Sequence, residues 1–144
     1  ALAGCESVHI GQDDVPYELV RRIAPQLSVG ISTHTPDQLE RALKERPRYV
    51  AYGPVFETST KSNPDPVVGV DGLERAALRA RAEGTPLVAI GGITLARIPE
   101  IAAHADAVAV IADLYPEGAT LHDVSERARA FQMALGVVPR RGAA

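Results

Sequence analysis

The sequence predicts an α/β fold in which a parallel β-sheet alternates with helices. Three observations support this: short apolar runs recur, a helical pattern or turn residues follow each run, and the runs are nearly continuous. The runs are residues 8–10, 28–31, 49–52, 87–90 and 107–111. Continuous apolar character is typical of strands buried on both faces. Strict alternation of strands and helices favours parallel strands with right-handed crossovers.

The predicted strand ends are evenly spaced along the chain. The same separation joins Gly11 to Ser32, Ser32 to Gly53, and Gly91 to Ala112, whereas Gly53 to Gly91 is longer because it includes a loop. Such regular units suit a (β/α) barrel. An open doubly wound sheet of five strands fits the spacing equally well.

Two helix starts have the pattern of a capping box. Thr35 precedes Pro36 and has Gln38 three residues on, and Asp71 with Glu74 follows the same logic. A side-chain oxygen at the first of these positions accepts a backbone N–H bond from the first helical turn. We therefore predict helices that begin at Thr35 and at Asp71.

The last two helices should begin after Thr94 and after Thr120, and Gly136 is a stop signal for the second of them. We expect one domain over residues 1–136, which would be a partial barrel under the first of the two architectures. The segment 137–144, with Pro, two Arg and small residues, is predicted to be a mobile tail.

Composition excludes several classes of partner. The formal net charge is −3 and there is no basic patch, so nucleic acid and anionic membranes are not expected to bind. No segment approaches the ~18 apolar residues of a membrane span. The single cysteine, Cys5, rules out an internal disulfide, and the first four residues lack signal-peptide features. We expect a cytoplasmic protein.

Functional residues should gather at the carboxyl ends of the strands, because either architecture places its sites there. The segments that follow the predicted strands are 12–14, 32–34, 53–61, 91–94 and 111–113. All of them would lie on one rim of the sheet.

The segment from Gly53 to Lys61 is the most informative of these. A buried strand opens there into Thr58, Ser59, Thr60 and Lys61. Long loops inside compact domains are usually functional, and a lysine among hydroxyls suits an anion site. The alternative is that the threonines and the serine are ordinary turn residues and that the lysine is only solvated.

Asp13 and Asp14 follow the first predicted strand directly. A carboxylate in this place suits Mg²⁺, which needs few protein ligands and keeps waters and phosphates as the others. The alternative is that one of the two caps the following helix.

Gly91 and Gly92 stand between a strand and a helix that Thr94 would cap. Glycines let a phosphate approach backbone N–H groups, and the amino end of a helix favours its charge. A tight turn that needs positive φ is the other explanation. In a barrel, the loops after the last two strands form the usual phosphate site, which favours phosphate binding here.

His34, near Ser32, could act as a base or as a donor to phosphate, or could be a neutral histidine held by a backbone carbonyl. His9 lies inside a strand and is interpreted as structural. His104 and His122 fall in helical stretches and are interpreted as surface residues.

Taken in order, these segments resemble the thiamine-phosphate synthase family. The resemblance is carried by 9–14 (His-Ile-Gly-Gln-Asp-Asp), 30–35 (Gly-Ile-Ser-Thr-His-Thr), 53–56 (Gly-Pro-Val-Phe) with 58–61 (Thr-Ser-Thr-Lys), and 89–94 (Ala-Ile-Gly-Gly-Ile-Thr). It spans roughly residues 7–115. The third and fourth blocks together are fairly specific, whereas each alone is weak.

The resemblance implies a TIM (β/α)8 barrel, of which this chain would supply about five carboxyl-terminal βα units. It implies a transferase of thiamine biosynthesis. The enzyme joins hydroxymethylpyrimidine diphosphate to thiazole phosphate and releases pyrophosphate, with Mg²⁺ as cofactor. In this family the pyrimidine forms a carbocation, which the thiazole nitrogen captures.

Roles carried over by motif are as follows. Ser32 and Lys61 would be catalytic and hold the pyrimidine diphosphate, and Asp14 would bind magnesium. The remaining substrate-binding residues, mainly on the thiazole phosphate side, would be Thr58, Ser59, Thr60, Gly92, Ile111 and Ala112. The family commonly has serine where this chain has Ala112, so a hydroxyl donor is missing and the backbone N–H would serve.

The family also has about three further βα units ahead of the His9 segment, and these carry other diphosphate and metal ligands. Five of eight strands would leave two apolar edges unpaired. We therefore expect the 144 residues alone to be inactive. They should self-associate or pair with the missing amino-terminal segment.

Two other functions remain open. A thiazole tautomerase is a related barrel that isomerises the thiazole phosphate, and His34 would be its proton-shuttle candidate. A non-catalytic phosphate-binding domain is the second alternative. Thr60-Lys61 and Gln12-Asp13-Asp14 favour the synthase, because they suit diphosphate and metal.

Overall fold

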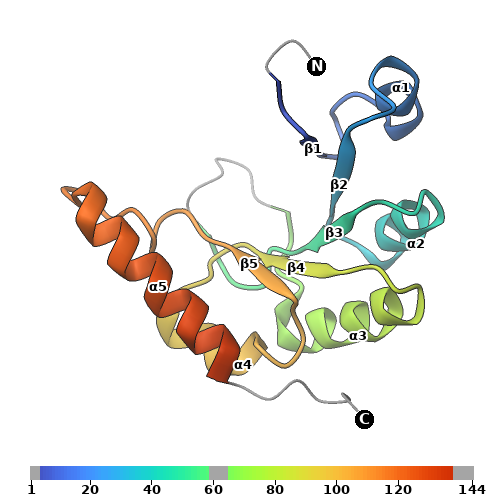
Figure 1. The fold of residues 1–144 in the computed structure, drawn as a ribbon. Helices are drawn as coiled ribbons and strands as arrows, with labels where there is room; N and C mark the ends of the chain where they lie inside the picture. Colours follow the sequence, from blue (N-terminus) through green and yellow to red (C-terminus); the bar gives the residue numbers. More distant parts are fainter. Residues whose placement is uncertain (1–3, 59–64, 138–144) are drawn as a thin grey trace.

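A computed structural model describes residues 4–58 and 65–137 of the chain. Its centre is one parallel sheet whose strands neighbour each other in sequence order. The strands are β1 (Ser7–Ile10), β2 (Ser28–Thr33), β3 (Tyr49–Tyr52), β4 (Leu87–Ile90) and β5 (Ala107–Ala109). Figure 1 shows that they form an arc rather than a flat sheet.

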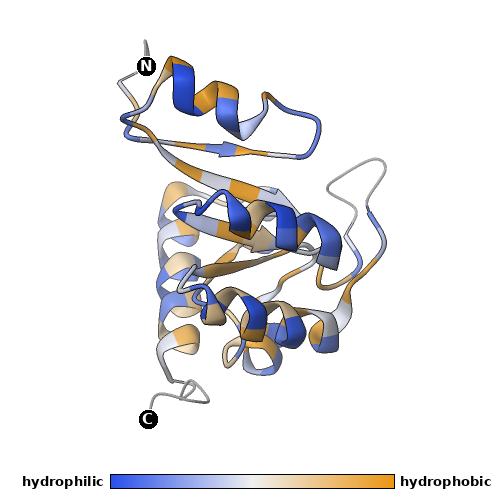
Figure 2. Cartoon of the chain, turned by 90° about the vertical axis from the view of Figure 1, so that its right-hand side faces the viewer, coloured by the Kyte–Doolittle hydropathy of each residue, from blue (hydrophilic) through white to orange (hydrophobic). Residues whose placement is uncertain are grey.

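The helices between the strands lie along the outer side of this arc (Figure 1). They are α1 (Tyr17–Ile23), α2 (Pro36–Lys44), α3 (Gly69–Ala82), the short 3₁₀ helix η1 (Leu95–Arg97), α4 (Ile98–Ile101) and α5 (Leu121–Val137). Figure 2 shows hydrophilic and hydrophobic residues alternating along the helices, as expected where one helix face packs on a sheet.

The strand order decides between the two predicted architectures. A doubly wound sheet reverses its strand order at a switch point and carries helices on both faces. Here the order is β1-β2-β3-β4-β5, without reversal. Alternate strand residues, among them Ile31, Val50, Tyr52 and Leu87, enter one core with the helices. The fold is therefore part of a (β/α)8 barrel, as predicted.

Burial of the strands on both faces is confirmed only for the middle of the sheet. In β1, Ser7 and His9 are exposed, and in β5, Ala107 and Ala109 are exposed. Each of these strands is an edge strand of the sheet and pairs with one neighbouring strand. β5 also ends at Ala109, two residues before its predicted end, whereas β2 continues to Thr33.

The two predicted capping boxes have different outcomes. Thr35 caps α2, because its Oγ1 accepts a hydrogen bond from the Gln38 N–H at 3.2 Å. The Gln38 side chain accepts from the His34 N–H at 2.7 Å, which ties the end of β2 to the helix. The prediction for Asp71 is wrong, since α3 begins at Gly69 and Asp71 lies inside its first turn.

The α5 start is confirmed. The Thr120 N–H donates to Asp123 at 2.8 Å, the Asp123 N–H donates back to the Thr120 hydroxyl at 3.2 Å, and the Thr120 bonds hold the pKa of the Asp123 carboxyl below its usual value. Gly136 does not stop the helix, which continues to Val137. The rest of the predicted tail, 138–144, lies outside the described residues.

Within the described ranges, no helix has both the length and the apolar character needed to cross a membrane.

Replacing the α2 cap tests this local structure. Thr35→Ala should lower the free energy of unfolding by about 1 kcal/mol in urea denaturation, because the Gln38 N–H loses its acceptor. Thr94→Ala is the matched control, since Thr94 occupies the N-cap position of η1 without a side-chain cap bond. Equal losses in the two variants would contradict this explanation.

Candidate functional site

A cavity of about 630 Å³ lies on the face of the sheet opposite the helix-covered core and continues to the carboxyl ends of the strands. Six residues predicted from the sequence line it, namely Ser32, His34, Thr58, Gly92, Ile111 and Ala112. Asp14 is not among the lining residues, and Ser59, Thr60 and Lys61 lie outside the described residues.

The period of a β-strand explains which side chains reach this cavity. Successive residues point to opposite faces. In β3, Tyr49 and Ala51 line the cavity while Val50 and Tyr52 enter the core, and the neighbouring strand β4 alternates in the same way. A single face of the sheet therefore provides the floor of the site.

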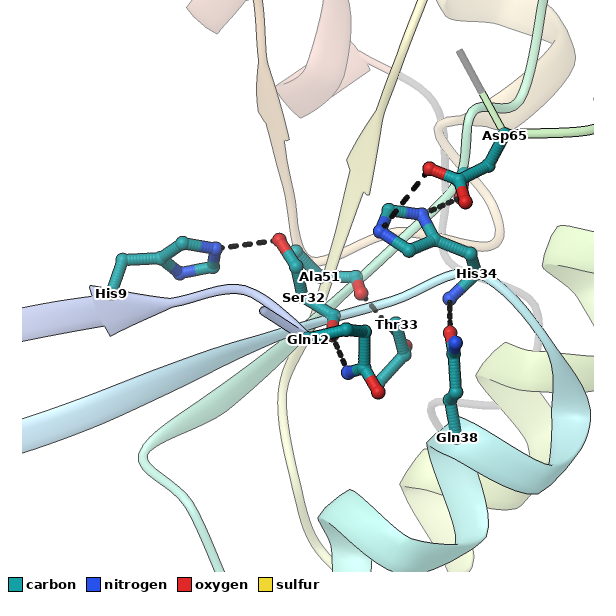
Figure 3. A network of polar contacts seen from close by, with 9 residues as sticks. His9, Gln12, Ser32, Thr33, His34, Gln38, Ala51 and Asp65 are labelled. Atoms are coloured by element: carbon teal, nitrogen blue, oxygen red, sulfur yellow. Dashed lines mark hydrogen bonds and ion pairs between the residues drawn. The ribbon is translucent and has the colours of Figure 1, made fainter. Parts of the chain in front are cut away.

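Ser32 lies inside β2 rather than after it, which corrects its predicted place, and its side chain is held by β1. The Ser32 Oγ is 2.7 Å from His9 Nε2, and the Gln12 side chain donates to the Ser32 carbonyl at 2.6 Å. Figure 3 shows both contacts. The end of β1 thereby fixes the backbone and the hydroxyl of the residue predicted to hold a diphosphate.

His9 lines the cavity as well, although the sequence analysis interpreted it as structural. Its Nδ1 is 2.9 Å from the Tyr49 hydroxyl, and the two rings are stacked with centroids 5.5 Å apart. Burial lowers the pKa of His9, and the Asp14 carboxylate offsets part of that effect. The alternation of His9 with the apolar Val8 and Ile10 is the sequence signal that could have shown which face it occupies.

His34 follows β2, and a backbone carbonyl holds its ring, as one of the interpretations from the sequence expected. Its Nδ1 is 2.6 Å from the Gly53 carbonyl, so Nδ1 carries the donated proton. Nε2 lies 3.6 Å from a carboxylate oxygen of Asp65 (Figure 3). His34 thus connects β2 to both ends of the loop between β3 and α3.

Gly91 and Gly92 are required by a close approach of two loops. Both have positive φ, of 89° and 63°. A Cβ on Gly91 would lie 2.4 Å from Pro54 Cβ, and one on Gly92 would lie 2.3 Å from the Glu57 carbonyl oxygen. The Phe56 N–H also donates to the Gly91 carbonyl at 3.1 Å. Tight-turn geometry therefore accounts for both glycines before any ligand is considered.

Arg97 was not singled out from the sequence, yet it lines the cavity beside this turn. Its guanidinium donates to the Gly92 carbonyl at 2.8 Å and lies 4.5 Å from the centroid of the Phe56 ring. Arg97 therefore holds the glycine turn against the loop that begins at Gly53.

The 111–112 segment is brought next to the glycine turn by Asp113. The Asp113 carboxylate accepts from the Leu95 N–H at 2.8 Å and pairs with Arg127 of α5. Leu95 is the first residue of η1, so a protein carboxylate already occupies the helix end predicted to favour phosphate. Thr94 makes no side-chain cap bond there, and the prediction of a Thr-capped helix is wrong.

Asp14 makes a contact that the sequence analysis did not foresee. Its Oδ2 accepts from the Gly11 N–H at 2.7 Å, which closes the turn after β1. It does not cap α1, because Pro16 is the N-cap residue and α1 has no side-chain cap bond. In residues 4–58 and 65–137, no group of three or more His, Cys, Asp or Glu side chains could hold a metal ion.

The lowered pKa of His9 can be measured by NMR titration of its ring. The midpoint should lie below the ordinary value of about 6.5. Asp14→Asn should lower it further, because the carboxylate favours the imidazolium, and Asp13→Asn should change it less. An Asp14→Asn midpoint above that of the unmodified chain would contradict this.

The sign of the linked stability follows from the same shift. As the pH falls below about 6.5, the His9 imidazole becomes protonated in the unfolded chain before it does in the folded chain. The free energy of unfolding therefore falls as the pH falls. Above that pH both states are neutral and His9 contributes no pH dependence.

Comparison with known proteins places the chain in one family. The family model described as thiamine monophosphate synthase matches residues 1–114. The thiamine-phosphate synthase of Koribacter versatilis is 48% identical over 131 residues, which cover 90% of this chain and 58% of that protein. That of Methanocella arvoryzae is 40% identical over 126 residues, which cover 86% and 56%.

A solved structure agrees with this result. Thiamine phosphate pyrophosphorylase from Pyrococcus furiosus superposes with a TM-score of 0.76 at 29% identity, covering 91% of this chain and 59% of that one. The chain thus spans a little over half the length of these relatives. With a family match over most of its residues, the chain belongs to the thiamine monophosphate synthase family.

Proposed function

We propose that this chain carries the substrate cavity of a thiamine-phosphate synthase. The observation that carries the proposal is the convergence of Ser32, Thr58, Gly92 and the 111–112 segment on one cavity. These residues come from the ends of four separate strands, β2, β3, β4 and β5, and the synthase names of the relatives fit their chemistry. Hydroxymethylpyrimidine diphosphate and thiazole phosphate would be the substrates, and thiamine phosphate and pyrophosphate the products.

The reaction makes one bond and breaks one. The C–O bond between the pyrimidine methylene and the diphosphate breaks, and pyrophosphate leaves with the electron pair. The thiazole nitrogen then forms the new C–N bond and keeps the positive charge. Donors and cations aimed at the leaving diphosphate are what such a site must supply.

Ser32 would donate its hydroxyl to the diphosphate, with Lys61 as the companion cation. Arg97 is the only Lys or Arg among the described residues that line the cavity, and its guanidinium is engaged with Gly92 and Phe56. Carboxylates of Glu57, Asp65 and Asp113 line the same cavity. Binding of two phosphorylated substrates would therefore depend on further positive charge.

Magnesium would supply part of that charge. Its chemistry when bound would be to neutralise the developing charge on the leaving pyrophosphate. Asp14 fits as a single ligand, because Mg²⁺ uses one or two carboxylates together with water and substrate phosphates. One oxygen of Asp14 holds the Gly11 N–H, and within the described residues its other oxygen has no hydrogen-bond partner.

The thiazole phosphate would lie at the other end of the cavity. Its ligands would be Thr58, Ser59, Thr60, Gly92, Ile111 and Ala112, with the backbone N–H of Ala112 in place of a hydroxyl. The bridge from Asp113 to Leu95 supports this grouping, because it joins the 111–112 segment to the glycine turn.

We also propose that the two edge strands of the sheet pair with further protein segments. β1 and β5 each have one strand partner in the chain and expose residues of the cavity face. Parallel strands are stable when both neighbours and both faces are covered. The chain would self-associate, or pair with barrel segments equivalent to the unmatched parts of its relatives, in the cytoplasm.

A thiazole tautomerase is the second candidate, and one observation favours it. His34 lines the cavity with Nδ1 bonded to the Gly53 carbonyl, which leaves Nε2 as the nitrogen that could accept a proton near Asp65. Metal-free exchange of a thiazole proton with solvent would support this function.

The deciding assay is pyrophosphate release from both substrates with magnesium. The 144-residue chain alone should be inactive, and activity should appear with the remaining part of the Koribacter versatilis relative supplied in trans. Turnover by the chain alone as a monomer would contradict the incomplete-barrel account. Binding of thiazole phosphate without turnover in the complemented protein would indicate a non-catalytic phosphate-binding domain.

Replacing Ser32 tests the diphosphate end of the cavity. Ser32→Ala should weaken binding of the pyrimidine diphosphate about 10- to 100-fold, as expected for loss of a hydrogen bond to a charged group. Ser28→Ala is the matched control, because Ser28 is an exposed serine at the opposite end of β2. Calorimetry gives both affinities, and equal affinities would remove Ser32 from the site.

A further inference from the structure

His9, Gly30 and Tyr49 form one row across three strands. The register pairs His9 with Gly30 and Gly30 with Tyr49. A Cβ on Gly30 would lie 2.1 Å from the Tyr49 ring, so only glycine lets that ring cross β2 toward His9. The row explains how a tyrosine on β3 reaches a histidine on β1.

From this row a continuous hydrogen-bond chain runs to Ser32. The Tyr49 hydroxyl is 2.9 Å from His9 Nδ1, and His9 Nε2 is 2.7 Å from Ser32 Oγ. A neutral imidazole has one N–H and one bare nitrogen. The two hydroxyls and the imidazole therefore hold three protons for two hydrogen bonds, and the third proton must point outward from one end of the chain.

The two ends differ in what they offer a ligand. In one state Tyr49 donates to Nδ1 and Nε2–H donates to Ser32, which leaves the serine proton free for the cavity. In the other state Ser32 donates to Nε2 and Nδ1–H donates to Tyr49, so Ser32 offers only oxygen lone pairs and the outward proton belongs to the Tyr49 hydroxyl. Ionised phosphate oxygens accept hydrogen bonds, so an anion that contacts Ser32 binds well only to the first state.

We infer that Tyr49 and His9 are positioning residues that aim the Ser32 proton at a diphosphate group in the cavity. This inference rests on the proposed function, because it takes the diphosphate as the ligand of Ser32. Partial desolvation of the His9 ring supports it separately, because it lowers the pKa of His9 and so favours the neutral imidazole. The Gln12 side chain also donates to the Ser32 carbonyl, which fixes the backbone that carries the hydroxyl.

The test uses inorganic pyrophosphate with magnesium as the probe and the 144-residue chain. Correlation spectra of the histidine ring nitrogens distinguish the Nε2–H from the Nδ1–H tautomer. At pH 7.5, pyrophosphate should convert any Nδ1–H population of His9 to Nε2–H. The signals of His122, an exposed residue of α5, should stay unchanged and serve as the internal reference.

Variants give a second readout. His9→Leu should weaken pyrophosphate binding about 3- to 10-fold, the usual range for one hydrogen bond. Tyr49→Phe should weaken it less, because the donor to Ser32 remains. His9→Gln should restore most of the affinity, because its side-chain amide can donate near the place of Nε2. Failure of His9→Gln to rescue would mean that His9 acts through packing alone and would overturn the inference.

The remaining outcomes separate the two claims. If pyrophosphate binds the unmodified chain but His9 stays in the Nδ1–H tautomer, or if all variants bind equally, the inference is wrong and the proposed function stands. If pyrophosphate does not bind the unmodified chain at all, the diphosphate cavity itself is wrong, and the inference falls with it.

Discussion

The arrangement of the site depends on one close approach, between the glycine turn after β4 and the loop after β3. Val55 and Phe56 donate their N–H groups to the Ile90 and Gly91 carbonyls at 2.8 and 3.1 Å. Any side chain at Gly91 or Gly92 would overlap the opposing loop. This contact sets where the β3 loop leaves the sheet, and so where Thr58 enters the cavity.

Contacts within the protein already engage two of the charged side chains that line the cavity. The Arg97 guanidinium is engaged with Gly92 and Phe56, and Asp113 occupies the first N–H of η1. In the described part of the cavity, the groups left to meet an anion are hydroxyl and N–H donors such as that of Ser32. The positive charge that two phosphorylated substrates require would come from Lys61 and from magnesium near Asp14, which is why both belong to the proposed function.

Much of the fold was predictable from the sequence, because apolar runs and regular spacing report strands and crossovers directly. The choice of barrel over open sheet needed strand order, which spacing does not contain. That residues at the strand ends would gather at one cavity was also predictable, as the positions of Ser32 and Gly92 show. The contact between His9 and Tyr49 was missed because it depends on cross-strand register and on the space above Gly30. The Asp71 cap was wrong because α3 begins at Gly69, which places Asp71 in the first helical turn instead of at the N-cap.

The most direct test of the account is a crystal structure of the chain with magnesium and pyrophosphate. We predict the anion on the concave face of the sheet, with one oxygen within hydrogen-bonding distance of Ser32 Oγ and the metal ion between that anion and Asp14. Pyrophosphate bound on the helix-covered side of the sheet, or in this cavity without contact to Ser32, would contradict the central claim.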